Sequence, residues 1–159
     1  MRVHPGRGGV AVLTKEEMAA ESLALLRSIC ASMKNANDSK EQWLALQMLC
    51  PEALQGASEI LEQKAIVRIV AKDSRRAFHV IDSASRGKSH TCLPGFCTCM
   101  AYCMTVASKP ESLVCKHELA ILLADALGIT EDSVKEEAEF ARELDHRTTL
   151  PMTLYETQQ

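Results

Sequence analysis

The chain has 159 residues, of which 47% are hydrophobic and 25% are charged, as is typical of a single globular domain with its own core. No stretch approaches the roughly 20 apolar residues of a membrane span, and residues 1–13 lack the apolar run of a secretion signal, so we expect an intracellular protein. The formal charge of −3 includes a basic middle, net +6 over residues 64–117, and an acidic end, net −7 over residues 118–159. The basic middle can face a polyanion, or it can balance the acidic end within one fold.

The first third of the sequence predicts a short arm followed by helices. Residues 1–13 contain one proline and three glycines and should form a flexible arm. Residues 14–64 should form a helical region, because two capping-box spacings precede apolar residues at helical intervals. We expect the first helix to end near residues 35–38, and a proline to end the second helix or begin the third. The residues that carry these signals are Thr14 with Glu17, Ser39 with Gln42, and Pro51.

The pattern changes to strands at residue 65. Residues 65–70 are rich in β-branched side chains, residues 72–75 have the composition of a turn, and residues 77–81 are suited to a return strand. A third strand should begin at residues 90–92 and lead into a group of cysteines. We therefore expect a small antiparallel sheet.

The last part of the sequence predicts two further helices. Residues 119–127 are apolar almost all round, which indicates a buried helix, and Gly128 stands where a helix-ending glycine belongs. Thr130 should cap an acidic last helix, and residues 146–159 should form a polar tail. The apolar face expected for this last helix is Val134, Ala138, Ala141 and Leu144.

Four residues have the spacing of a structural zinc site. Cys97 and Cys99 form one pair, Cys115 and His117 form another, and each pair is separated by a single residue. A short bend brings two such side chains to the same side, so two pairs supply the four ligands of a closed tetrahedral site. Three thiolates and one imidazole suit Zn²⁺ better than hard cations. Reduced cysteines in an intracellular protein also favour metal binding over disulfides.

The remaining cysteines have a simpler interpretation. Cys30 and Cys50 lie in apolar helical segments and should pack as small hydrophobic residues. Cys92 and Cys103 are closer to the ligand pairs, and Cys103 follows Cys99 by four residues, so it could compete as a ligand. We expect both to pack, because the two pairs already complete a tetrahedron.

The cysteine pairs and their neighbours resemble the SWIM zinc finger. The motif there is C-x-C, an aromatic residue three positions later, and then C-K-H-x-x-A. Over residues 40–128 the chain also resembles the SWIM-domain subunits of the Shu complex, except at Met100, where proline is common in that family. The matching segments are Cys97-Thr98-Cys99-Met100-Ala101-Tyr102, Cys115-Lys116-His117-Glu118-Leu119-Ala120, Ser74-Arg75-Arg76, Ile81 and Thr91-Cys92-Leu93.

The expected fold is therefore α+β, with a small antiparallel sheet and a SWIM zinc finger packed with N-terminal and C-terminal helices. Residues 65–128 should hold the hairpin, the finger and the buried helix, and residues 129–159 an acidic helix and tail. The resemblance implies a nuclear, non-catalytic adaptor that pairs with a RecA-like partner, either a recombinase paralogue or a SWIM-associated protein. Such a heterodimer promotes recombinase filament assembly in homologous recombination, with weak or indirect contact to single-stranded DNA.

The apolar helices also favour a partner interface. Segments 23–33, 43–49 and 119–127 offer more apolar surface than one small sheet can cover, and we expect Trp43 to form part of the exposed surplus. The alternative is that these helices only cover the sheet. A different function, that of a stand-alone nucleic-acid-binding finger, would use the basic residues Lys72, Arg75, Arg76, Arg86 and Lys88.

Two motifs that suggest catalysis are incomplete. The segment 86–89, Arg-Gly-Lys-Ser, resembles the end of a phosphate-binding loop, but the required first glycine would stand at Asp82. His117 and Glu118 resemble a metalloprotease helix, but the second histidine would stand at Ile121. We therefore expect no enzymatic activity.

Overall fold

The computed structural model describes residues 14–33, 39–83, 87–109 and 111–156. The arm predicted for residues 1–13 lies outside the described residues. None of the described helices is both long enough and apolar enough to cross a membrane. The helices are α1 (Lys15–Ser32), α2 (Lys40–Leu49), α3 (Pro51–Glu62), the π-helix Tyr102–Ser108, α4 (Lys116–Leu127) and α5 (Glu137–Glu156). The strands are β1 (Ile66–Ala71), β2 (Ala77–Ser83), β3 (Lys88–Leu93), β4 (Phe96–Cys97) and β5 (Glu131–Lys135).

The predicted start of α1 is confirmed. The Glu17 amide donates to Thr14 Oγ1 at 3.2 Å, and the Thr14 amide donates to Glu17 Oε2 at 2.8 Å, which completes a capping box. The helix ends at Ser32, a few residues before the predicted end. Ser39 precedes α2 as expected, but its side chain makes no capping hydrogen bond. Pro51 opens α3, where its missing N–H costs nothing.

The antiparallel arrangement predicted for residues 65–92 is confirmed in β1, β2 and β3, and the sheet contains two strands that the sequence did not predict, β4 and β5. The strand order in the described part is β4-β3-β2-β1-β5; the first four strands are antiparallel, and β5 runs parallel to β1. Thr130 does not cap a helix, because β5 follows it, and its hydroxyl donates to Asp125 Oδ1 at 2.7 Å.

The last helix therefore begins and ends later than predicted. It starts at Glu137 and continues to Glu156, through most of the segment that was expected to be a polar tail. Among residues 137–149, whose side chains the structure describes, the buried one is Phe140, which the predicted apolar face did not include. Of that predicted face, Leu144 packs partly buried against the second core, whereas Ala138 and Ala141 are exposed. Val134 belongs to β5 and is 63% exposed.

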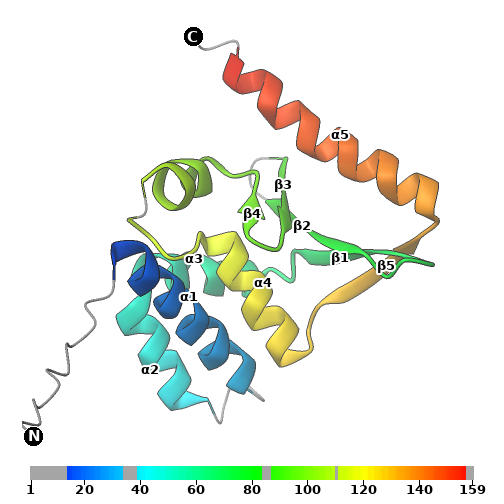
Figure 1. Cartoon of the computed structure of the whole chain (residues 1–159). Coiled ribbons are helices and arrows are strands. Elements are labelled where there is room, and N and C mark those ends of the chain that lie inside the picture. Colours follow the sequence, from blue (N-terminus) through cyan, green and yellow to red (C-terminus); the bar gives the residue numbers. More distant parts are fainter. Residues whose placement is uncertain (1–13, 34–38, 84–86, 110, 157–159) are drawn as a thin grey trace, which may run out of the picture.

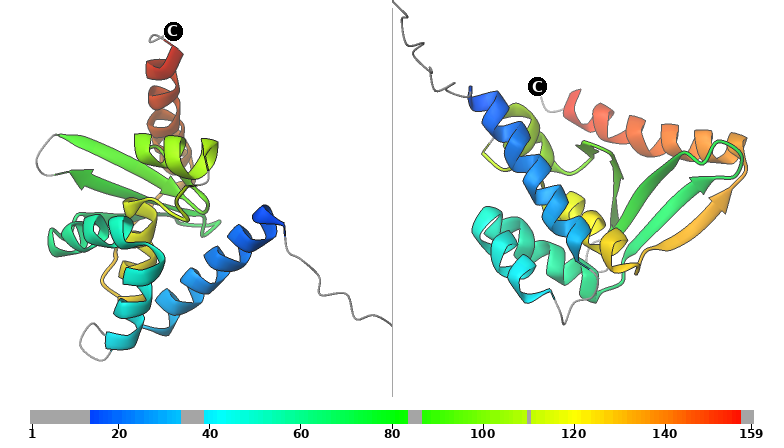
Figure 2. Two further views of the ribbon diagram at one scale, coloured as in Figure 1. Left: turned by 90° about the vertical axis from the view of Figure 1, so that its left-hand side faces the viewer. Right: turned by 60° about the horizontal axis from the view of Figure 1, so that its bottom comes forward.

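Helices lie on both sides of the sheet (Figure 1, Figure 2). Each face of the sheet has its own core. The first core packs α1 to α4 against one face, with Leu26, Leu46 and Leu119 fully buried. The second core lies between the other face and α5, where the rings of Phe78 and Phe140 are 5.1 Å apart. The alternation of a strand supplies both faces. In β1, Ile66 belongs to the first core, whereas Ile69 and Ala71 belong to the second.

The acidic end of the chain balances part of the basic middle. Three ion pairs join β1, and the turn after it, to β5 and the start of α5: Arg68–Asp132 at 2.7 Å, Lys72–Glu136 at 2.8 Å and Arg76–Glu137 at 2.9 Å. They support the second interpretation of the charge pattern, in which opposite charges meet within the fold.

Candidate metal centre

The predicted ligands lie where a hairpin meets the start of a helix. Cys97 ends β4, directly across from Cys92 of β3, and Cys99 follows in the loop before the π-helix. Cys115 is the N-cap residue of α4, and His117 lies in the first turn of that helix. The hairpin and α4 therefore each contribute one of the two predicted pairs.

The structure brings these four residues together. One potential ligand atom from each of Cys97, Cys99, Cys115 and His117 lies within 4.8 Å of all the others. All four residues are at most 5% exposed. Nδ1 of His117 lies 3.8 Å from Sγ of Cys97, so this nitrogen is the one that faces the thiols. Neighbouring ligand atoms of a tetrahedral zinc site stand roughly 3.5–3.8 Å apart, given Zn–S bonds of about 2.3 Å and Zn–N bonds of about 2.0 Å. The separation of Nδ1 from Sγ is therefore compatible with such a site.

Backbone amides support negative charge on two of the sulfurs. The Tyr102 amide donates to Cys99 Sγ at 3.2 Å, and the Glu118 amide donates to Cys115 Sγ at 3.4 Å. The second bond comes from the first turn of α4, where the helix dipole also favours an anion. These donors suit thiolate ligands better than neutral buried thiols.

The three thiols cannot all ionise easily at this separation unless a cation is present. Hydrogen bonds with Cys97 and Cys99 raise the pKa of Cys115. Hydrogen bonds from Cys115 and then from Cys97 lower the pKa of Cys99. A divalent cation at the centre of the cluster would favour the ionised form of all three thiols.

The other cysteines lie outside this four-residue group. Cys92 is buried, and its thiol donates to Cys97 Sγ at 3.3 Å, so it packs directly behind a ligand. Cys103 is partly exposed and does not belong to the cluster. Cys30 and Cys50 are buried in the first core, as predicted, and burial raises the pKa of Cys30 to about 11.

Two aromatic contacts frame the site. The ring of His90 lies 4.4 Å from that of His117, at an angle of 42°. Tyr102, the aromatic residue of the motif, packs edge-on against Phe96 at 5.9 Å, and its hydroxyl donates to the Gly95 carbonyl. The motif indicates Tyr102, but nothing in the sequence places His90 beside His117, because that contact depends on the packing of α4 against β3.

The two catalytic motifs gain no support from the local structure. Gly87 directly precedes β3, which begins at Lys88, whereas a phosphate-binding loop leads into a helix. Ile121 is buried in α4 and provides no ligand at the position of the missing histidine.

Comparison with curated proteins finds relatives called Zinc finger SWIM domain-containing protein 7. The chain is 31% identical to the mouse protein over 114 residues, which cover 70% of this chain and 70% of the relative. It is 30% identical to the human protein over 114 residues, covering 70% of this chain and 76% of the relative. The zebrafish protein is 36% identical over 81 residues, covering 50% of this chain and 56% of the relative. No family model and no solved structure matches the chain.

Proposed function

Because the chain belongs to the SWIM-type zinc-finger family, to which the mouse and human relatives connect it over 70% of its length, we propose that its cluster holds one Zn²⁺ as a closed structural site. The observation that carries this proposal is the burial of Cys97, Cys99, Cys115 and His117 with their ligand atoms within 4.8 Å of one another. Four protein ligands leave no open position for water, so the ion would serve structure and not catalysis.

The zinc would join the β3–β4 hairpin to the start of α4. Helix α3 packs closely against the same junction at Gly56. A Cβ at Gly56 would lie only 2.7 Å from Cδ of Lys116, the residue between Cys115 and His117. The ion therefore holds a junction at which the sheet, α3 and α4 meet. Removing it should disorganise residues 90–127 and should not merely slow a reaction.

We further propose that the protein is a non-catalytic adaptor that forms a heterodimer with a RecA-like partner in homologous recombination, as the SWIM-domain resemblance implies. A physical observation supports a partner of some kind. Met48 is 86% exposed and Leu44 58% exposed on α2, while α1 exposes Met18 and Leu25. Trp43 is partly buried against the first core, so its neighbours offer more free apolar surface than it does.

The stand-alone nucleic-acid-binding function has less support. Two of its five candidate residues, Lys72 and Arg76, are paired with Glu136 and Glu137. Arg75 and Lys88 are exposed and form no ion pair within the described residues, and Arg86 lies outside those residues. Two unpaired cations are few for strong phosphate binding.

The zinc proposal is tested by elemental analysis of protein purified without chelator. We expect one zinc per chain in the wild type and in Cys103→Ser, and loss of zinc with disorder of residues 90–127 in Cys115→Ser. Cys103→Ser is the matched control, because it removes a nearby thiol that lies outside the cluster. Protein that contains no zinc would refute this assignment.

The adaptor proposal is tested by co-expression with a RecA-like partner. We expect higher solubility and a one-to-one complex for the wild type, and loss of the complex for Cys115→Ser. A stable, well-dispersed monomer whose partner binding survives the loss of zinc would contradict the proposed mechanism.

A further inference from the structure

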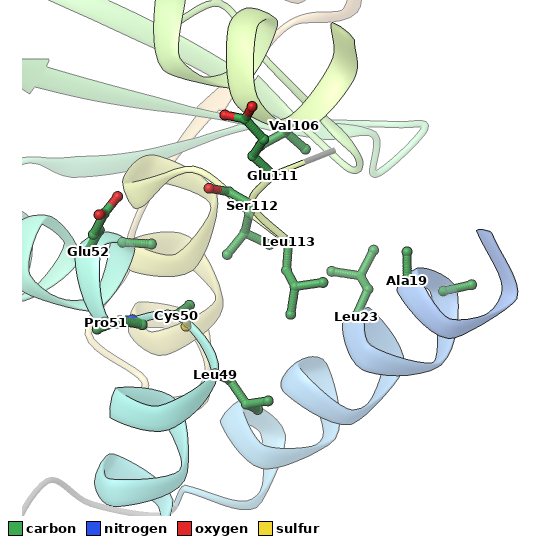
Figure 3. Close-up of a pocket in the computed structure, with 13 residues that line it drawn as sticks. Ala19, Leu23, Leu49, Cys50, Pro51, Glu52, Val106, Glu111, Ser112 and Leu113 are labelled. Atoms are coloured by element: carbon green, nitrogen blue, oxygen red, sulfur yellow. The ribbon is translucent and has the colours of Figure 1, made fainter. Parts of the chain in front are cut away.

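An open apolar groove lies on the helical side of the molecule, away from the zinc ligands themselves. It has a volume of about 450 Å³, within the range of binding pockets. Three parts of the chain form its walls: α1 near its start, the junction of α2 with α3, and Val106 together with residues 111–114 (Figure 3). The apolar lining residues include Ala20, Leu23, Leu49, Ala53, Val106 and Leu113.

The charge around this groove has one sign. Glu52 and Glu111 line it, and no lysine, arginine or histidine among the described residues does so. Neither carboxylate forms an ion pair within the described part of the chain. Glu16 is exposed on α1 four residues before Ala20, which places a third carboxylate on the same side of that helix. An occupant that brings positive charge to this rim would therefore be attracted to it.

The finger holds one wall of the groove in place. Val114, a lining residue, directly precedes the ligand Cys115. The amides of Glu111 and Ser112 donate to the Thr105 carbonyl at 2.9 and 3.0 Å, which fastens this wall to the π-helix. The π-helix is in turn fastened to the cluster by the bond from the Tyr102 amide to Cys99 Sγ. The shape of the groove therefore depends on the metal centre.

We propose that this groove binds an amphipathic α-helix of a partner protein, with aliphatic side chains at positions i, i+4 and i+7 and lysine or arginine beside them. This rests on the proposed adaptor function and names the surface it uses. A helix suits the groove because its walls come from helices and one irregular segment, with no strand edge among them for an extended peptide to join. The carboxylates oppose an anionic lipid surface, and the few polar groups do not converge as they would around a small polar ligand.

The test selects peptides from a displayed library of random sequences on immobilised, zinc-loaded protein, measures the affinity of the enriched peptides by fluorescence anisotropy, and determines whether they bind as helices. Ala20→Trp fills the groove from an exposed position, so the fold should survive. Ala24→Trp is its matched control, because Ala24 is also exposed on α1 but does not line the groove. Glu52→Lys with Glu111→Lys reverses the rim charge, and Glu21→Lys with Glu62→Lys is the control at exposed positions outside the groove.

We expect enriched peptides to be basic and amphipathic. Ala20→Trp should weaken their binding by at least about tenfold, and the rim reversal should weaken it by roughly five- to tenfold at low salt. Both control variants should bind as the wild type does. No enrichment, enrichment of acidic or extended peptides, or binding that Ala20→Trp leaves unchanged would overturn the proposal.

Two further outcomes would assign the groove to a different occupant. If deleting residues 1–13 raised peptide affinity tenfold, the chain's own N-terminal segment would be the occupant. If the wild type self-associated and Ala20→Trp did not, a second copy of this chain would be the occupant. Either result refutes the partner helix. All groove variants should keep one zinc per chain, so failure here is distinguishable from failure of the zinc site, which only the elemental analysis measures.

Discussion

Replacing Phe140 by alanine tests how α5 is attached to the sheet. Phe140 is 2% exposed, its ring lies 5.1 Å from that of Phe78, and the Arg76 guanidinium lies 5.3 Å from its ring centroid. Phe-to-Ala changes in a core cost about 3–5 kcal/mol. Of this, the ring pair accounts for about 1 kcal/mol and the contact with the exposed Arg76 for about 0.5 kcal/mol. We expect a loss of about 3–5 kcal/mol in the free energy of unfolding.

The loss should also be confined to one face of the sheet. The second core is separate from the first, so Phe140→Ala should release α5 and β5 while the helical side, with the Cys/His cluster, stays folded. Chemical denaturation with zinc in excess measures the free energy, and hydrogen exchange shows where protection is lost. Val134→Ala, at an exposed position of β5, should stay within about 0.5 kcal/mol of the wild type. A loss under about 1 kcal/mol, or loss of zinc from Phe140→Ala, would refute the two-core argument.

Three other predictions concern the site and the charges. Cys92→Ala should keep one zinc but lower zinc affinity about tenfold in chelator competition, because Cys92 donates a hydrogen bond to the predicted ligand Cys97. Cys103→Ala is the control and should leave zinc affinity unchanged. Complete loss of zinc from Cys92→Ala would instead make Cys92 a ligand. Glu136→Gln with Glu137→Gln should strengthen the weak binding of single-stranded DNA and steepen its dependence on salt, because Lys72 and Arg76 lose their partners; Glu62→Gln is the control, and an unchanged affinity would show that these pairs do not mask the charges. The zinc-loaded chain should hydrolyse neither ATP nor peptide bonds, and an activity that co-purifies with the wild type but is absent from Cys97→Ser of unchanged fold would contradict the structural role of the metal.

The features that the sequence predicts well depend on short spacing. The Thr14–Glu17 capping box spans three positions, Pro51 acts through its own backbone, and the two members of each predicted ligand pair stand two positions apart. Their geometry follows from the local backbone alone. The same is true of Gly128, whose φ of 66° provides the left-handed end of α4.

The features that could not be predicted depend on distant partners. Strand β5, Glu-Asp-Ser-Val-Lys, has a single apolar residue and no strand pattern of its own. It is extended because it pairs with β1 and because Arg68 binds Asp132 through two hydrogen bonds of 2.8 and 2.7 Å. Once residues 131–135 form a strand, α5 can begin only at Glu137, which makes Phe140 its buried residue. The groove likewise exists only after three separate segments have met.

The pairing of β5 with β1 also constrains how the chain assembles. Arg68 and Asp132 are 64 residues apart, whereas the cluster spans only residues 97–117. Closing the shorter loop costs less chain entropy, and a closed finger brings β1 and residues 131–135 nearer to one another. During synthesis, residues 66–71 leave the ribosome long before β5 exists to cover them. Until then the edge of β1 stays open to other chains, so conditions that delay zinc binding should first appear as aggregation of newly made protein.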